Sequence, residues 1–181
     1  MSETVRGVIL LRAVNVSGRN RVPMAELRAL LAERVGLTGV STYIASGNVV
    51  VDVPDDAGAA LLAVRALIAE EFGVDTPAIL RTHAQLTAAL AENPFPDAAA
   101  DKLLHVMFLA GEPREGGVGA LTERLGPGER IAVRGTDLWI DYAEGGVHTT
   151  RLTTPVFDRA LGVPGTARNL RTLRKLVELT A

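Results

Sequence analysis

The sequence predicts an α+β protein made of two ferredoxin-like halves in tandem, each with a split β-α-β arrangement, and a docked C-terminal helix. Short apolar runs rich in branched residues, typical of strands, alternate with segments whose apolar residues recur at helical spacing. The order strand, helix, strand, strand, helix, strand is that of the ferredoxin-like fold, and a related order begins again after the proline-marked link ENPFP. We therefore expect one half at residues 1–92 and the other at residues 93–181.

The first half is expected to hold four strands and two helices. The strands are expected at residues 5–14, 40–44, 49–53 and 78–82, and the helices at residues 23–35 and 59–72. Pro23 suits the first turn of a helix, and a glycine ends each helical pattern. The sequence ASGN joins the second and third strands, because Gly47 and Asn48 tolerate the positive backbone angles of a tight hairpin.

The second half is expected to repeat this order with one gap. After a short helix at residues 84–91, strands are expected at 103–109, 130–134 and 138–142, and helices at 118–125, from 154 onward and at 167–179. Gly135 and Thr136 are expected to form the hairpin turn. No obvious last strand precedes the closing helix. Its leucines share one face, by which the helix should dock.

Composition and charge exclude several classes of protein. The chain of 181 residues has a formal charge of -2 and a pI near 5.9, so it lacks the broad positive surface of a nonspecific nucleic-acid binder. Without cysteine there is no disulfide, thiolate zinc site or cysteine nucleophile. The histidines, His83, His105 and His148, lack metal-ligand spacing, so no metal or cofactor is expected. The apolar run at 8–11 is too short for a signal peptide, and no run suits a membrane helix, which indicates a cytoplasmic location.

Three polar clusters interrupt the apolar chain at the ends of expected elements. The candidate binding residues are Arg12, Asn15, Gly18 and Asn20 in the loop after the first strand, Ser46 and Asn48 in the hairpin, and Arg168, Asn169 and Thr172 at the start of the closing helix. A loop that leads from a strand into a helix can direct backbone N–H groups at an anion, and so can a helix start that carries arginines. Each cluster also has a structural interpretation, because such residues satisfy turn backbones and Thr166 can cap the helix.

The clusters contain no recognisable catalytic group. No histidine stands in a known sequence relation to Ser17, Ser46 or Thr172, and no pair of carboxylates indicates a general acid and base. The loop sequence VNVSGRN lacks both the Gly-Lys-Ser/Thr ending of a Walker motif and the GxGxxG pattern. The sequence therefore favours a binding protein over an enzyme, and nothing in it selects a reaction type.

Four motifs together resemble the bacterial domain-of-unknown-function 1697 (DUF1697) family. In chain order they are LLRAVNVSGRNRVPMAELRALL, TYIASGNVVVD, ENPFP and ARNLRTLRKLVEL. The resemblance implies a cytoplasmic α+β protein with a split ferredoxin-like arrangement, in a family whose activity is not established. The family's motif positions coincide with the three polar clusters. The chain departs from the family pattern at Ala13 and Ser17, where the family usually has glycine, and at Ala45, where it often has glutamine.

We hypothesise that the clusters converge on one polar pocket between the halves. Arg12, Arg168 and loop N–H groups would hold the anionic group of a phosphorylated metabolite or nucleotide, and asparagines would orient the rest. One alternative is single-stranded nucleic-acid binding, which requires exposed aromatic rings and has only Tyr43, Trp139 and Tyr142 available. The other is a homodimeric interaction protein without catalysis, formed through open sheet faces.

Overall fold

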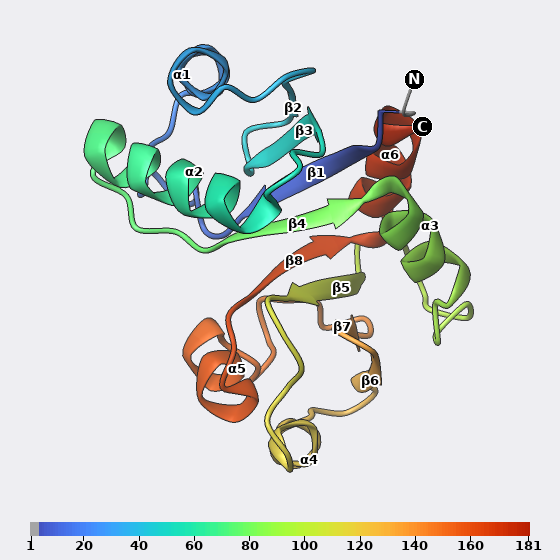
Figure 1. Cartoon of the computed structure of the whole chain (residues 1–181). Helices are drawn as coiled ribbons and strands as arrows, with labels where there is room; N and C mark the ends of the chain where they lie inside the picture. Colours follow the sequence, from blue (N-terminus) through green and yellow to red (C-terminus); the bar gives the residue numbers. More distant parts are fainter. Residues whose placement is uncertain (1–3) are drawn as a thin grey trace. The chain divides into compact units, whose positions relative to one another are not determined.

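The first half of the chain forms a four-stranded antiparallel sheet with helices packed on one face (Figure 1). The computed structural model describes residues 4–181. The elements are β1 (Arg6–Leu11), α1 (Met24–Leu30) with its continuation η1 (Leu31–Val35), β2 (Ser41–Tyr43), β3 (Asn48–Asp52), α2 (Ala57–Phe72) and β4 (Ala78–Thr82). The strand order is β2-β3-β1-β4. This is the ferredoxin-like order, as the sequence predicts.

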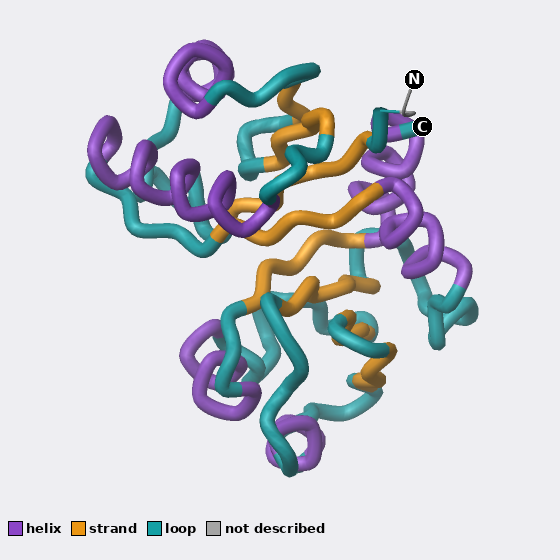
Figure 2. Tube along the Cα trace, in the orientation of Figure 1, coloured by secondary structure: helices purple, strands orange, loops and turns teal. Residues whose placement is uncertain are grey.

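The second half repeats this arrangement with its own sheet and helices (Figure 2). Its elements, with the helices that precede and follow them, are α3 (His83–Ala91), β5 (Leu104–Leu109), α4 (Gly117–Thr122), β6 (Arg130–Arg134), β7 (Asp137–Asp141), α5 (Thr154–Leu161), β8 (Gly165–Asn169) and α6 (Leu170–Thr180). The strand order β6-β7-β5-β8 matches that of the first sheet position by position. The predicted fold class, two split β-α-β halves and a C-terminal helix, is therefore confirmed.

Contacts between backbone positions divide the chain into two compact units. The second unit is Thr87–Lys175, and the first contains the chain up to Leu86 together with Leu176–Ala181. The division runs through α3 and through α6, whereas the sequence places the boundary between residues 92 and 93. We use "first unit" and "second unit" for these two parts and describe each by itself.

Alternating apolar residues build the core of the first unit. Ile9 and Leu11 on β1 and Val49 and Val51 on β3 point to the same face of the sheet, since successive residues of a strand point to opposite faces. They pack against Leu27, Leu31, Val64 and Ile68 of the helices. Each of these side chains is almost completely buried, and each contributes roughly 1.5–3 kcal/mol relative to an exposed position. This core holds both ends of the loop that follows β1.

The second unit has an equivalent core between its sheet and the pair α4 and α5. Met107 and Leu109 of β5 and Leu138 and Ile140 of β7 face Leu121, Phe157 and Leu161 of the helices. The predicted hairpin between β6 and β7 has the expected register, with Ala132 opposite Trp139. Trp139 therefore lies on the sheet face that points away from α4 and α5, and its side chain is completely buried.

The strand β8 corrects the sequence prediction for the end of the chain. The segment GTARN pairs with β5, whereas the sequence places it at the start of the closing helix and shows no obvious last strand. One face of β8 carries Thr166 and Arg168, so the apolar alternation that reveals other strands is missing. On the other face, residue 165 is a glycine, and a larger residue would not fit there because its Cβ atom would clash with the side chains of Met107 and Leu109. A short polar strand of this kind gives no hydrophobic signal.

The start of the closing helix is corrected as well. α6 begins at Leu170, three residues later than predicted. Its cap is Asn169, whose Oδ1 accepts a hydrogen bond of 2.9 Å from the backbone N–H of Thr172. Thr166 lies within β8 and cannot cap the helix. Asparagine is among the strongest N-cap residues, which explains why the helix begins immediately after it.

Candidate functional site

The loop after β1, residues 12–22, is a miniature hairpin, and we call it the opening loop. Its backbone is left-handed at five positions with φ between 50° and 73°, namely Ala13, Asn15, Ser17, Gly18 and Asn20. Val16 and Arg19 form a bridge across the turn made by Ser17 and Gly18, with a hydrogen bond of 2.9 Å from the N–H of Arg19 to the carbonyl of Val16. Two successive left-handed residues are typical of a type I′ turn, the tightest hairpin connection.

Asn15 holds the opening loop closed and attaches it to the turn between β2 and β3. Its Nδ2 donates to the carbonyl oxygen of Val22 at 2.9 Å and to that of Ala45 at 2.8 Å. Its Oδ1 accepts from the backbone N–H of Val22 at 2.8 Å. Asn20 adds a bond of 2.9 Å from its Nδ2 to the carbonyl of Ala13. Two of the three predicted polar clusters therefore meet within the first unit.

The side chain of Asn48 stabilises the turn between β2 and β3, residues 44–47, by hydrogen bonds. This side chain is 0% exposed, and its Nδ2 donates to the carbonyl of Tyr43 and to Oγ of Ser46, both at 3.1 Å. Gly47 has φ of 85°, and a Cβ atom there would clash with the side chains of Leu11 and Val14. Ile44 also has a left-handed backbone, with φ of 51°, although it is β-branched and 52% exposed. A branched residue in this region is strained.

The two departures from the family pattern in the opening loop both lie at left-handed positions. Ala13 has φ of 55° and Ser17 has φ of 50°. Glycine adopts this conformation without steric penalty, which gives a physical reason for glycine at both positions in the family pattern. The chain keeps the same backbone path with residues that are less suited to it.

Thr76, which no sequence pattern distinguishes, anchors the start of the opening loop. It is 1% exposed, and its Oγ1 accepts a bond of 2.9 Å from the N–H of Arg12 and donates one of 2.8 Å to the carbonyl of Arg12. Beyond this anchor the loop carries Arg19 and Arg21, both exposed. Residues 12–22 include three arginines and no carboxylate, so the loop is strongly positive on a chain of net charge -2.

The third predicted cluster lies in the second unit and is largely buried. Arg168 is 8% exposed, and its Nη1 donates to Oγ1 of Thr166 at 2.8 Å and to the carbonyl of Ala167 at 2.9 Å. Removal from water lowers the pKa of the Arg168 guanidinium to about 10. Asn169 and Thr172 form the helix cap. The convergence of these residues with the opening loop stays a prediction.

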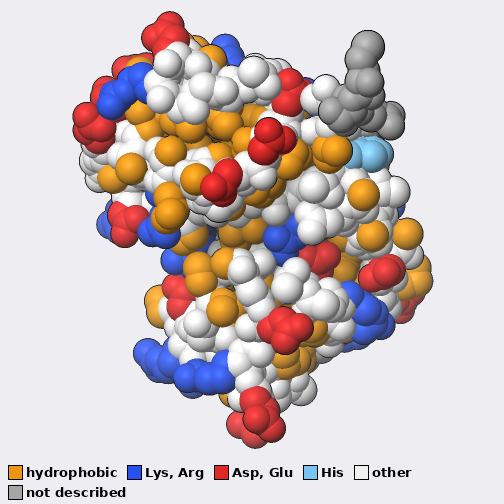
Figure 3. Space-filling model, in the orientation of Figure 1, with side chains coloured by type: hydrophobic (Ala, Val, Ile, Leu, Met, Phe, Trp, Pro, Cys, Tyr) orange, Lys and Arg blue, Asp and Glu red, His pale blue; other side chains and the backbone are white. Residues whose placement is uncertain are grey.

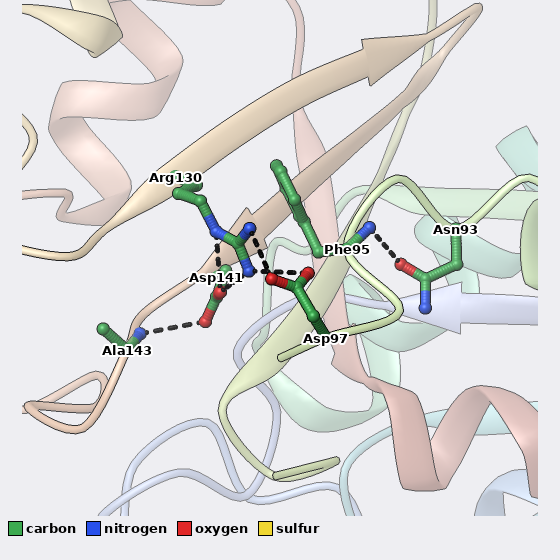
Figure 4. A network of polar contacts seen from close by, with 6 residues as sticks. All are labelled: Asn93, Phe95, Asp97, Arg130, Asp141 and Ala143. Atoms are coloured by element: carbon green, nitrogen blue, oxygen red, sulfur yellow. Dashed lines mark hydrogen bonds and ion pairs between the residues drawn. The ribbon is translucent and has the colours of Figure 1, made fainter. Parts of the chain in front are cut away.

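A polar network in the second unit involves residues outside the predicted site residues (Figure 4). The Nε and Nη2 atoms of Arg130 donate to Oδ2 of Asp141 at 3.1 and 2.6 Å. The same guanidinium donates to both carboxylate oxygens of Asp97 at 3.2 Å and lies 4.5 Å from the ring centroid of Phe95. These hydrogen bonds lower the pKa of Asp97.

The network fixes the ENPFP link to the second sheet. Asn93 supports it by accepting a bond of 2.9 Å from the N–H of Phe95. Asp141 also accepts a bond of 3.0 Å from the N–H of Ala143 through Oδ1. Because every charge in this group has a protein partner, we interpret it as a structural clamp. The motif that carries the resemblance here, ENPFP, supplies two of its members, Asn93 and Phe95, and Asp97 follows the motif directly.

Metal-ligand clusters and membrane-crossing helices are both absent from the described residues. Within residues 4–181, no three side chains among His, Asp and Glu come together as metal ligands would. Over the same range, no helix combines the length and apolar character that crossing a membrane requires.

Comparison with known proteins identifies a family and a fold. A family model described as "Protein of unknown function (DUF1697)" matches residues 5–139. The structure of the conserved bacterial protein SP0830 from Streptococcus pneumoniae is similar, with a TM-score of 0.74 and 24% sequence identity. The alignment covers 99% of this chain and 100% of that one, so the two share the fold throughout. No curated protein matches the chain.

Proposed function

The chain belongs to the DUF1697 family, and from that premise we propose that it binds an anionic small molecule, a phosphorylated metabolite or a nucleotide, at the opening loop. One observation carries the proposal. Asn15 fastens the loop with its arginines to the turn at residues 44–47, so that two separate motifs form one continuous surface.

The charge and the rigidity of the opening loop both favour an anion. Arg12, Arg19 and Arg21 provide guanidinium groups, which form paired hydrogen bonds with phosphate and carboxylate oxygens. Among the described residues, the backbone N–H groups of Ser17 and Gly18 have no hydrogen-bond partner, so they add two donors at the tip. Because the loop is already held in one conformation, binding loses little conformational entropy.

The asparagines of the first two polar clusters have a mainly supporting part in this proposal. The side-chain amides of Asn15, Asn20 and Asn48 donate hydrogen bonds to backbone carbonyls of the protein itself. These residues therefore shape the surface more than they contact a ligand. Arg168, Asn169 and Thr172 are expected from the sequence to join the site, and substitution of Arg168 by glutamine tests that expectation separately. A chain without cysteine also fits the cytoplasmic location that we propose.

The alternatives are weaker on physical grounds. Single-stranded nucleic acid requires exposed aromatic rings, and Trp139 and Tyr142 are 0% and 5% exposed. A homodimer needs an apolar contact surface, for which the first unit offers the exposed side chains of Val16 and Ile44. Sedimentation at two protein concentrations tests the homodimer, since a monomer at both would exclude it.

A thermal-shift experiment tests the proposal. The wild type and the double variant Arg19→Gln, Arg21→Gln are heated with inorganic phosphate, glucose 6-phosphate, AMP, ATP and a short oligonucleotide. A ligand at about 100 times its dissociation constant adds roughly 2.7 kcal/mol of apparent stability, which raises the melting temperature by several degrees. We expect a phosphorylated compound to do so in the wild type and not in the double variant.

The matched control is Arg151→Gln, which removes one exposed arginine outside the opening loop. It should keep the full shift. Equal shifts in all three proteins would mean that the arginines of the opening loop do not bind the ligand. No shift with any compound in the wild type would contradict the proposed function.

A further inference from the structure

A cavity of about 300 Å³ lies between α4 and α5 in the second unit. Its apolar lining consists of small residues, namely Gly116, Gly117, Ala120, Val156 and Ala160. Its charged lining consists of Arg114, Glu115, Arg124 and Arg159. In Figure 3 basic side chains gather beside these two helices. The cavity thus combines a small apolar surface with an excess of positive charge.

Backbone contacts join the two helices that form this cavity. Gly117 allows α4 to approach α5 closely, since a Cβ atom there would clash with the carbonyl oxygen of Ala160. The loop before α4 is tied to the end of α5 by a hydrogen bond of 2.8 Å from the N–H of Arg114 to the carbonyl of Leu161. The Arg114 guanidinium donates to the carbonyls of Arg159 and Ala160. The positive charge of Arg114 therefore interacts with the carbonyl groups at the C-terminal end of α5.

Two cations remain for a ligand. Among residues 4–181, the guanidinium groups of Arg124 and Arg159 form no hydrogen bond or ion pair, although both line the cavity. Glu115 is the single carboxylate of the lining. Two unpaired guanidiniums against one carboxylate attract an anion, and each guanidinium can form paired hydrogen bonds with a carboxylate or phosphate group.

We propose that this cavity binds a small organic anion, with a compact apolar body against the small residues and one carboxylate or phosphate group held by Arg124 and Arg159. The volume is at the lower end of the range for ligand sites and accommodates a body about the size of one aromatic ring. Carboxylate and phosphate share the geometry that guanidinium recognises. The site belongs to the second unit and shares no residue with the opening loop. Its test therefore does not depend on whether the proposed function is correct.

The test is a titration of the full-length ¹⁵N-labelled protein, followed by amide chemical shifts. The probes are phenyl phosphate and benzoate, with inorganic phosphate and benzyl alcohol as the two separate halves of the ligand. We expect saturable shifts at Gly116, Gly117 and Ala120. One of the two complete probes should bind at least about tenfold more tightly than either half, and which of them does so identifies the anionic group.

Three variants separate the contributions. Arg124→Gln and Arg159→Gln should each weaken binding about tenfold, as expected for loss of one charged hydrogen-bonding partner. Ala120→Leu places a larger side chain in the cavity and should block the complete probes. Arg151→Gln, an exposed arginine outside the lining, should leave the affinity unchanged.

Four results would overturn the proposal. They are the absence of saturable shifts at these amides up to about 10 mM probe, unchanged affinity in both arginine variants, equal weakening by Arg151→Gln, and unchanged binding by Ala120→Leu. Inorganic phosphate that binds as tightly as phenyl phosphate would overturn the assignment of the apolar body. Each variant's folding is checked from the dispersion of the same spectra, so loss of the fold is not read as loss of the site.

Discussion

The side-chain amide of Asn15 donates a hydrogen bond of 2.8 Å to the carbonyl oxygen of Ala45, which is 30 positions further along the chain. The same nitrogen donates to Val22, at the far end of the opening loop. One side chain thus closes a loop and joins it to a turn between two other strands. The family resemblance rests on both segments, and this contact explains physically why they occur together.

Substitution of Asn15 by alanine should destabilise the protein by about 2–3 kcal/mol, because three hydrogen bonds are lost and two carbonyls and one N–H lose their partner. Asn20→Ala is the matched control. Asn20 has nearly the same φ, 52° against 54°, but its side chain makes one such bond, so about 1 kcal/mol is expected. Urea unfolding measures both values. Equal losses would mean that the bonds of Asn15 contribute nothing beyond those of Asn20.

Substitutions at the left-handed residues of the opening loop should change the free energy of unfolding in opposite directions. Ala13→Gly and Ser17→Gly should each raise the free energy of unfolding by up to about 1 kcal/mol, because glycine adopts φ near 50° without steric penalty. Gly18→Ala should lower it by a similar amount. A Cβ at residue 18 meets no atom within 4 Å, so any loss there reflects backbone strain alone. Destabilisation by both glycine variants would show that the loop relaxes in solution to another conformation.

Substitutions of Arg130 and of its partner Asp97 should reduce the stability of the protein by unequal amounts. Arg130→Ala should destabilise by about 2–4 kcal/mol, because it leaves the carboxylate of Asp141, which is 4% exposed, without its cation. Asp97→Ala should have a much smaller effect, since that carboxylate is exposed and screened by solvent. Chemical denaturation gives both values. A larger loss for Asp97→Ala than for Arg130→Ala would contradict this order.

His105 predicts a dependence of stability on pH. Burial lowers the pKa of His105 below its ordinary value of 6.5, against a smaller opposing effect from the carbonyl of Lys102. The unfolded chain therefore binds more protons than the folded one at pH values between the two pKa values, and stability falls as the pH decreases through 6.5. His105→Gln should flatten this part of the curve. Unfolding midpoints from pH 8 to pH 5 measure it, and an unchanged slope would exclude His105 as its source.

Most of the fold follows from hydrophobic alternation, and the exceptions have physical causes. β4 and β6 have the predicted bounds, and the hairpin at Gly135 has the predicted register. The sequence does not predict β8, because Thr166 and Arg168 are of residue types that are usually exposed. Both are in fact buried, on the sheet face that points away from α4 and α5. Position in the sheet, which is a long-range property, decides the structure of such a segment more than its composition does.

The candidate site was predictable in its residue types but not in its geometry. Turn chemistry correctly indicated that Asn15, Gly18 and Asn20 form a loop, yet nothing local shows that Asn15 reaches Ala45. Thr76 has no signal in the sequence, because its role depends on the packing of β4 beside β1. Arg124 and Arg159 become a pair only when α4 and α5 meet, which no spacing along the chain reveals.

The most direct test of the central claim is a titration of ¹⁵N-labelled protein with AMP and with glucose 6-phosphate, followed by amide chemical shifts. Anion binding at the opening loop predicts saturable changes at Ser17, Gly18 and Arg19 and in the turn at residues 44–47, and their loss in the variant Arg19→Gln, Arg21→Gln. Saturable changes confined to other parts of the chain, or no change with either compound, would contradict it.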